Sequence, residues 1–126
     1  MPNQPAPQPV PAVILAGGRA RRMGGGDKSL VRLADRPVLG HVLARLGPQA
    51  SPIALNANGP AARFADFGLP VLPDTVPDWP GPLAGILAGL DWAAQRGLPQ
   101  VVTVAADKPF FPRDLVARLE AASEAA

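Results

Sequence analysis

The sequence predicts an α/β fold in which helices cover both faces of a mainly parallel sheet. Two observations favour this class. Short, fully apolar runs alternate along the chain with segments whose apolar residues recur at helical spacing. The apolar runs are typical of strands that are buried on both faces, and parallel strands need crossover connections between them.

The composition is typical of one globular domain with a real core: 126 residues, 48% hydrophobic and 17% charged. The absence of cysteine excludes disulfides, cysteine-based zinc sites and a thiol nucleophile, and the single histidine excludes a two-histidine metal site. A net charge of only +2 favours neither nucleic acid nor a membrane as a partner. Because the sequence contains no targeting segment, we expect a cytoplasmic protein.

The first part of the chain predicts a tail followed by a strand. Residues 1–11 contain five prolines and no lysine or arginine, so we expect a disordered tail there and a nucleotide-binding domain over residues 12–126. Residues 12–16 form a fully apolar run, which predicts a buried strand. The strand stops at Gly17, and a polar, glycine-rich segment follows as far as Lys28.

The next elements are a short extended piece and a helix. We expect residues 30–33 to be extended and residues 35–37 to form a turn. Apolar residues then recur at helical spacing from Val38 to Leu46, and the Gly-Pro pair at Gly47 ends this helix.

The middle of the chain predicts two more strands around a brief helix. Residues 53–55 and 71–72 are short apolar runs, and residues 61–67 fit a helix between them. Residues 73–82 contain four prolines and therefore form a loop.

The last third predicts a helix, a strand and a final helix. Helical spacing begins at Leu83 and runs to about Arg96, where a glycine caps the helix. Residues 101–105 are the most strand-like run of the chain and lead directly into Asp107. The final helix opens at Pro112 and continues to the chain end.

Four loops follow predicted strands, those at Gly17, Asn56, Asp74 and Asp107. In a parallel sheet, ligands bind outside the carboxyl ends of the strands. We therefore expect these four loops to converge on one crevice.

The glycine-rich segment after the first strand is suited to binding phosphate. Glycines allow backbone N–H groups to approach phosphate oxygens, and three arginines and a lysine supply positive charge. The segment is not a Walker A loop, because Asp27 separates its last glycine from Lys28, and its glycines do not fit GxGxxG. From composition alone, a flexible surface loop with solvated basic side chains remains an equal alternative.

The string LAGGRARRMGG at residues 15–25, followed by Asp27 and Lys28, resembles the signature of the molybdenum cofactor guanylyltransferases. Sugar-phosphate and cytidylyl transferases of the same fold share it more loosely. The resemblance extends over residues 12–120, with further matches in order and spacing at Asn56-Ala57-Asn58, Asp74, Pro80-Gly81-Pro82-Leu83-Ala84-Gly85, and Asp107 before Pro109.

The resemblance implies a Rossmann-like nucleotidyltransferase domain, a three-layer sandwich with a mainly parallel sheet. It implies GTP and Mg²⁺, and transfer of GMP to the phosphate of molybdenum-bound molybdopterin with release of pyrophosphate. Family members are usually considerably longer, so it also implies a chain that is either truncated at its C-terminus or one half of a split enzyme. The residues that it assigns to the nucleotide are Leu15, Ala16, Gly17, Gly18, Lys28, Asn56, Asp74 and Asp107.

Physical roles for these residues agree with that reaction. The acceptor phosphate is largely ionised at neutral pH and needs little help from a general base. Mg²⁺ on Asp107, together with Lys28 and Arg22, would stabilise charge that develops toward the pyrophosphate leaving group. The carboxylate of Asp74 would accept both N–H donors of the guanine edge, and adenine lacks that pair of donors.

Each of these residues also has a structural alternative. Asp107 would cap the last helix, Asp74 would be an ordinary loop carboxylate, and Asn56 would occupy a turn. We expect His41 to be a structural residue of its helix. Lys108 stands where the family usually has a small residue, which adds a positive charge beside the expected metal ligand.

Two other functions stay open at this point. The first is a related nucleotidyltransferase that uses CTP or another nucleotide, although Asp74 and residues 81–85 favour guanine. The second is a nucleotide-binding or partner-binding module without catalysis. We also expect an exposed apolar sheet edge on the side of residues 101–105, covered by a homo-oligomer or a partner, and an exposed side chain at Arg63.

Overall fold

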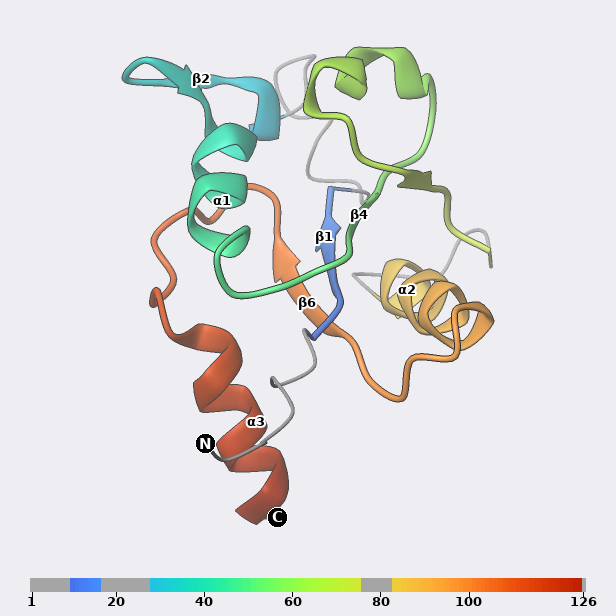
Figure 1. Ribbon diagram of the computed structural model, residues 1–126. Coiled ribbons are helices and arrows are strands. Elements are labelled where there is room, and N and C mark those ends of the chain that lie inside the picture. The colour runs from blue at the N-terminus through green and yellow to red at the C-terminus, as the bar shows by residue number, and fades with distance from the viewer. Residues whose placement is uncertain (1–9, 17–27, 76–82, 126) are drawn as a thin grey trace, which may run out of the picture.

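The computed structural model describes residues 10–16, 28–75 and 83–125 (Figure 1). Its centre is a four-stranded parallel sheet with the spatial order β5-β4-β1-β6. The strands lie where the sequence predicts them, at β1 (Ala12–Leu15), β4 (Ile53–Asn56), β5 (Val71–Leu72) and β6 (Val102–Ala105). The predicted α/β class with a parallel sheet is confirmed.

The strand order contains a reversal beside β1. The chain adds β4 and then β5 on one side of β1, and afterwards crosses back to place β6 on the other side. Numbered along the chain, these strands have the order 3-2-1-4, which matches the first four positions of the Rossmann order 3-2-1-4-5-6. Such sheets bind ligands where the order reverses, here at the carboxyl ends of β1 and β6.

Helices cover both faces of the sheet and make three layers. Helix α2 (Leu83–Gln95) lies on one face, while α1 (Val38–Leu46) and α3 (Leu115–Ala125) lie on the other (Figure 1). Successive strand side chains point to opposite faces. Within β1, Ile14 therefore packs in the cluster with α1, and Val13 packs against α2.

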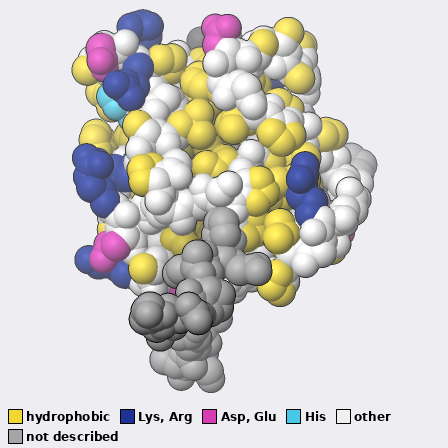
Figure 2. All heavy atoms as spheres, viewed as in Figure 1, with side chains coloured by type: hydrophobic (Ala, Val, Ile, Leu, Met, Phe, Trp, Pro, Cys, Tyr) yellow, Lys and Arg dark blue, Asp and Glu magenta, His cyan; other side chains and the backbone are white. Residues whose placement is uncertain are grey.

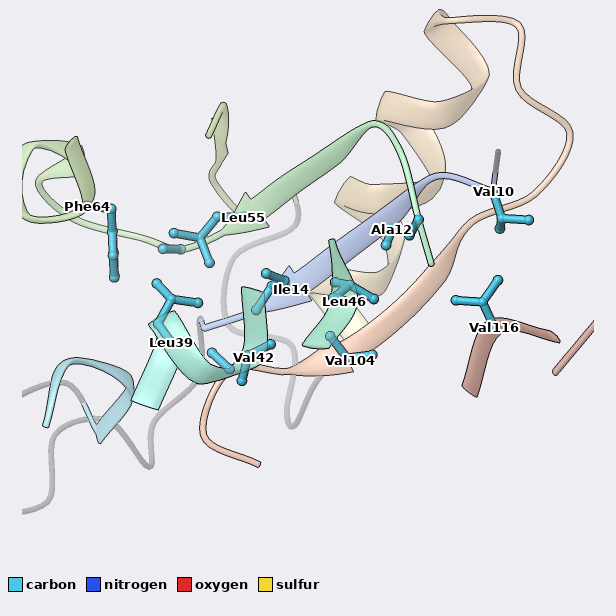
Figure 3. Packing of buried hydrophobic residues seen from close by; sticks show 13 residues of the cluster. Val10, Ala12, Ile14, Leu39, Val42, Leu46, Leu55, Phe64, Val104 and Val116 are labelled. Atoms are coloured by element: carbon cyan, nitrogen blue, oxygen red, sulfur yellow. The ribbon is translucent and has the colours of Figure 1, made fainter. Parts of the chain in front are cut away.

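The core on the α1 face is the larger of the two. In the close view of Figure 3, side chains of α1 point toward those of β1 and β6. Phe64 enters the same cluster from the 3₁₀ helix η3 (Ala61–Phe67) and is 1% exposed. Its residues are Val10, Ala12, Ile14, Leu39, Val42, Leu46, Ala50, Leu55, Ala57, Phe64, Val104, Ala106 and Val116.

The ordered part of the chain begins before the expected boundary. Val10 and Pro11 are buried, although the sequence placed them in the tail. Val10 accepts a hydrogen bond from the backbone of Ser51, and Pro11 accepts one from Val102. Proline lacks an N–H, but its carbonyl still extends the ladder. Residues 1–9 lie outside the described part.

A small hairpin separates β1 from α1. The 3₁₀ helix η2 (Lys28–Leu30) precedes β2 (Arg32–Leu33), which pairs antiparallel with β3 (Arg36–Pro37). The turn therefore lies at Ala34 and Asp35, where Ala34 has a φ of 60°, rather than over residues 35–37 as expected. His41 anchors the hairpin, because its Nε2 lies 2.5 Å from the carbonyl oxygen of Leu33. This agrees with the structural role expected for His41.

Figure 2 shows hydrophobic side chains across the middle of one face, with basic and acidic side chains beside each other along its margin. In the described part of the chain, no helix is long and apolar enough to span a membrane.

Candidate nucleotide site

The register of the sheet places the ends of its strands in one row. Leu15 of β1 lies opposite Asn56 on one side and Ala105 on the other, and Asn56 lies opposite Leu72. The ladder continues past the strand ends, because Ala16 donates to Asn56 and Ala106 donates to Leu15 through the backbone. This row is the carboxyl edge, at the top of the sheet in Figure 1.

Asp74 is held at the β4 side of this edge by two asparagines. Nδ2 of Asn56 donates to Oδ1 of Asp74 at 2.9 Å, and Nδ2 of Asn58 donates to Oδ2 at 2.9 Å. Oδ1 of Asn58 accepts the backbone N–H of Asp74 at 2.8 Å. Two of the four predicted loops therefore meet, and Asp74 is no ordinary solvated loop carboxylate.

Asn56 is itself fixed by a hydrogen bond to β5 and by close packing against α2. It is only 2% exposed, and its Nδ2 also donates to the carbonyl of Leu72 at 3.0 Å. A Cβ atom at Gly85 would lie 2.3 Å from Oδ1 of Asn56 and 2.9 Å from its Cγ. The first turn of α2 therefore approaches the asparagine more closely than any side chain at residue 85 would permit.

Gly85→Ala tests this close approach. Overpacking a filled site typically costs about 1–3 kcal/mol, and here it would also push Asn56 away from Asp74. We expect a lower melting temperature and weaker nucleotide binding, measured by thermal unfolding and calorimetry. Gly40→Ala is the matched control within α1: its nearest neighbour is the flexible Arg36 side chain, with Cδ at 3.2 Å. There the helix propensity of alanine gains about 1 kcal/mol. Equal effects at the two positions would contradict the tight packing around Asn56.

Arg63 supports the same corner of the site, and the expectation of an exposed side chain was wrong. The residue is half-buried, and its guanidinium donates to the carbonyls of Asn58, at 2.7 Å, and Pro60. It also lies over the ring of Phe64, 4.4 Å from the ring centroid. The sequence missed this role because hydrogen bonds from a side chain to backbone carbonyls three and five residues earlier leave no periodic pattern.

The β1 side of the site is described only in part. Leu15 and Ala16 are half-buried at the carboxyl edge. The predicted residues Gly17, Gly18 and Arg22 lie outside the described residues. Lys28 begins η2, but only its backbone is described.

Asp107 follows β6 on the other flank of β1. Its side chain is exposed, whereas Ala106 before it is buried and paired with Leu15. Helix α3 begins only at Leu115, so Asp107 does not cap that helix. The structure therefore contradicts the capping alternative and leaves the Asp107 carboxylate exposed just after β6.

Asp107 and Asp74 are separated across the edge. Asp74 bonds to residues that end β4, and Asp107 follows β6, with β1 between them. Two strand spacings, about 10 Å in all, separate the ends of β4 and β6. This arrangement suits an extended ligand better than a compact one.

The described residues are suited to a metal ion that is held partly by the phosphates of a bound ligand, rather than to one held by protein side chains alone. Among residues 10–16, 28–75 and 83–125, no group of three or more acidic, histidine or cysteine side chains is poised to hold a metal ion. Mg²⁺ usually binds through one or two carboxylates together with substrate phosphates and water. A single exposed carboxylate at Asp107 satisfies that requirement.

Sequence reasoning gave no individual role to Asn58 or to Gly85, although both lie in the motifs that carry the resemblance. It also missed two contacts to the segment that follows Asp107. Arg45 of α1 donates to the carbonyl of Phe111 at 2.7 Å, and Oε1 of Gln49 accepts the backbone N–H of Val116 at 2.9 Å. These contacts join residues more than 60 positions apart, which local patterns do not reveal.

Comparison with known proteins finds similarity in sequence and in fold. The sequence model described as the MobA-like NTP transferase domain matches residues 12–126. A molybdenum cofactor guanylyltransferase of Bradyrhizobium sp. (strain ORS 278) is 61% identical over 115 residues, which are 90% of this chain and 54% of that protein. One of Nitrobacter hamburgensis is 58% identical over 113 residues, 88% of this chain and 54% of that protein. The chain thus spans about half the length of the curated relatives it matches.

Solved structures share the fold at low identity. Rv0371c from Mycobacterium tuberculosis H37Rv superimposes with a TM-score of 0.63 at 23% identity, covering 93% of this chain and 61% of that one. A CMP:2-keto-3-deoxy-manno-octonic acid synthetase complexed with CTP gives 0.64 at 15% identity, covering 91% and 46%. These likenesses establish the nucleotidyltransferase-like fold that the sequence predicted.

Proposed function

The chain belongs to the MobA-like NTP transferase domain family, and from that premise we propose that it binds GTP and Mg²⁺ to transfer GMP to molybdenum-bound molybdopterin. Curated relatives at 53–61% identity carry the name molybdenum cofactor guanylyltransferase. The proposal treats residues 12–126 as the nucleotide-binding domain and keeps the cytoplasmic location expected from the sequence.

The observation that carries the proposal is the carboxylate of Asp74, held by two amide donors at the carboxyl edge of the sheet. An ionised carboxylate has about four acceptor positions, so two remain for a ligand. Guanine offers two adjacent donors, N1–H and the 2-amino group. Cytosine and adenine do not offer this pair, so Asp74 favours guanine over the nucleotides of the alternative transferases.

The remaining groups divide the nucleotide along the edge. With the base beside Asp74, the phosphates extend past Leu15 and Ala16 toward the end of β6. Lys28 and Arg22 supply positive charge to the phosphates, and Asp107 would hold Mg²⁺. The metal, when bound, neutralises phosphate charge and polarises the reacting phosphate.

The reaction is an in-line displacement at the α-phosphorus. A phosphate oxygen of the acceptor forms the new P–O bond, and the bond from the α-phosphorus to the bridging oxygen of pyrophosphate breaks. The acceptor phosphate is already largely ionised, since its second pKa is about 6. The residues of the chain therefore need to align reactants and neutralise charge rather than remove a proton.

Lys28→Ala tests the phosphate contact. Removing a charged partner of a phosphate typically costs about 1.5–3 kcal/mol, so GTP affinity should fall about tenfold to a hundredfold by calorimetry. Arg118→Ala is the control: this exposed cation of α3 pairs with Asp114 one turn away, and its loss should leave GTP affinity unchanged. Equal affinities for the two variants would contradict the assignment of Lys28.

A thermal-shift panel of GTP, CTP and ATP with Mg²⁺ tests which base the protein prefers. Stronger stabilisation by CTP than by GTP would overturn the guanine assignment.

A further inference from the structure

Asn58 contacts Asp74 with both ends of its side-chain amide. Its Nδ2 donates to the carboxylate at 2.9 Å, and its Oδ1 accepts the backbone N–H of the same residue at 2.8 Å. Two bonds from one planar amide to one residue fix both the position of the backbone and the direction of the carboxylate. Asn56, at 2.9 Å on the other carboxylate oxygen, completes the arrangement.

The direction of this carboxylate matters for any ligand that it recognises. A side-chain carboxylate turns readily about χ2, because that torsion is broad. Asn56 and Asn58 each occupy one oxygen of Asp74 and so prevent this rotation. The free acceptor position on each oxygen then points in a fixed direction, as two parallel donors on a purine edge require.

Asn58 is itself anchored to the core. The backbone carbonyl of Asn58 accepts a hydrogen bond from Nη2 of Arg63 at 2.7 Å. The guanidinium of Arg63 lies over Phe64, whose ring is 1% exposed within the main hydrophobic cluster. The residue whose amide contacts Asp74 is therefore tied through Arg63 to a buried ring of the core.

We propose that Asn58 is a specificity-determining positioning residue, which orients the carboxylate of Asp74 so that both of its oxygens meet the N1–H and 2-amino donors of guanine. This inference rests on the proposed function, because it assumes that Asp74 meets the base. It assigns to Asn58 the selectivity between purines rather than affinity for the phosphates.

The test compares GTP with inosine triphosphate (ITP), which lacks only the 2-amino group. Calorimetry on the intact protein should show tighter binding of GTP than of ITP. In Asn58→Asp, two carboxylates face each other and Asp74 is turned away. GTP then loses the bonds of both donors, whereas ITP, which has only N1–H, loses one. We expect GTP affinity to fall about tenfold more than ITP affinity, the size of one hydrogen bond to a charged group. The ratio of GTP affinity to ITP affinity should thus approach one.

The outcomes separate this inference from the function on which it rests. A preference for GTP that survives in a folded Asn58→Asp variant, whether both affinities fall equally or neither changes, would overturn the role of Asn58 alone. If the original protein shows no preference for GTP over ITP, guanine recognition by Asp74 fails and this inference fails with it. Gln100→Glu is the matched control, an exposed amide-to-acid change at the opposite edge of the sheet, and should leave the preference intact.

A double substitution keeps the test decisive if Asn58→Asp does not fold. In Asn58→Asp combined with Asp74→Asn, the amide introduced at position 74 donates to the carboxylate introduced at position 58. This reversed pair retains the link between the two loops, and circular dichroism checks that the fold is kept. The carboxylate no longer faces the base, so we expect the preference for GTP over ITP to be lost. Retention of that preference would overturn the proposal.

Discussion

Replacing Asp107 by asparagine is expected to abolish the Mg²⁺-dependent tightening of GTP binding and to lower the rate of GMP transfer about a thousandfold. The substitution preserves size but removes the charge that attracts Mg²⁺. Groups that stabilise charge in a transition state typically contribute factors of about 100 to 1,000 each, and loss of the metal removes such a group entirely. Calorimetry with and without Mg²⁺ measures the effect on GTP binding. A pyrophosphate-release assay measures the rate, in a preparation of the protein that transfers GMP before the substitution is made.

The fold should survive this change. Asp107 is exposed, and the hydrogen bonds around it are made by the buried backbone of Ala106 with Leu15. Asp91→Asn, at an exposed position of α2, is the control and should leave metal dependence intact. A folded Asp107→Asn variant that still tightens on GTP when Mg²⁺ is added would show that the metal is held elsewhere.

The fold was predictable because its signals are local. The run Ala12-Val13-Ile14-Leu15 is apolar on both sides, and the structure buries its alternate side chains against opposite layers. Helix α1 begins and ends where the spacing and Gly47 predicted. The hairpin turn was misplaced because two-residue strands carry almost no periodicity, and proline at residue 37 was taken as part of the turn when it occupies an edge strand.

The site was predictable only residue by residue. The sequence identified Asn56, Asp74 and Asp107 through a family resemblance, and the structure joins the first two by a hydrogen bond. The sequence did not reveal that Asn58 makes two hydrogen bonds to Asp74, or that the residue at position 85 must lack a side chain. Both facts depend on the approach of segments 16 to 29 positions apart, and no local pattern specifies that approach.

The open side of the sheet is the other feature with a large expected effect. Within the described residues, β6 pairs with β1 and ends the sheet. The backbone N–H groups of Val102 and Ala106 bond to the β1 side, so by alternation those of Thr103 and Ala105 point away from it. The side chains of β6 are buried or half-buried. The edge therefore exposes unpaired backbone groups more than large apolar side chains, which corrects the expectation of an apolar edge. Unpaired edges of this kind associate with other strands.

We expect the 126-residue chain, studied by itself, to bind GTP weakly, transfer little or no GMP, and self-associate through β6. Its nucleotide-side residues are present, but accurate placement of both reactants supplies much of the rate, and the curated relatives contain nearly as much polypeptide again. Thr103→Pro removes one outward N–H and should convert the associated form to a monomer, because proline is tolerated on an edge strand but cannot donate to a new partner. Light scattering coupled to size-exclusion chromatography measures the association, with circular dichroism to verify folding. If the original chain is a monodisperse monomer with robust GMP transfer to molybdopterin, this prediction is refuted, because the open edge then needs no partner and these residues suffice for both substrates.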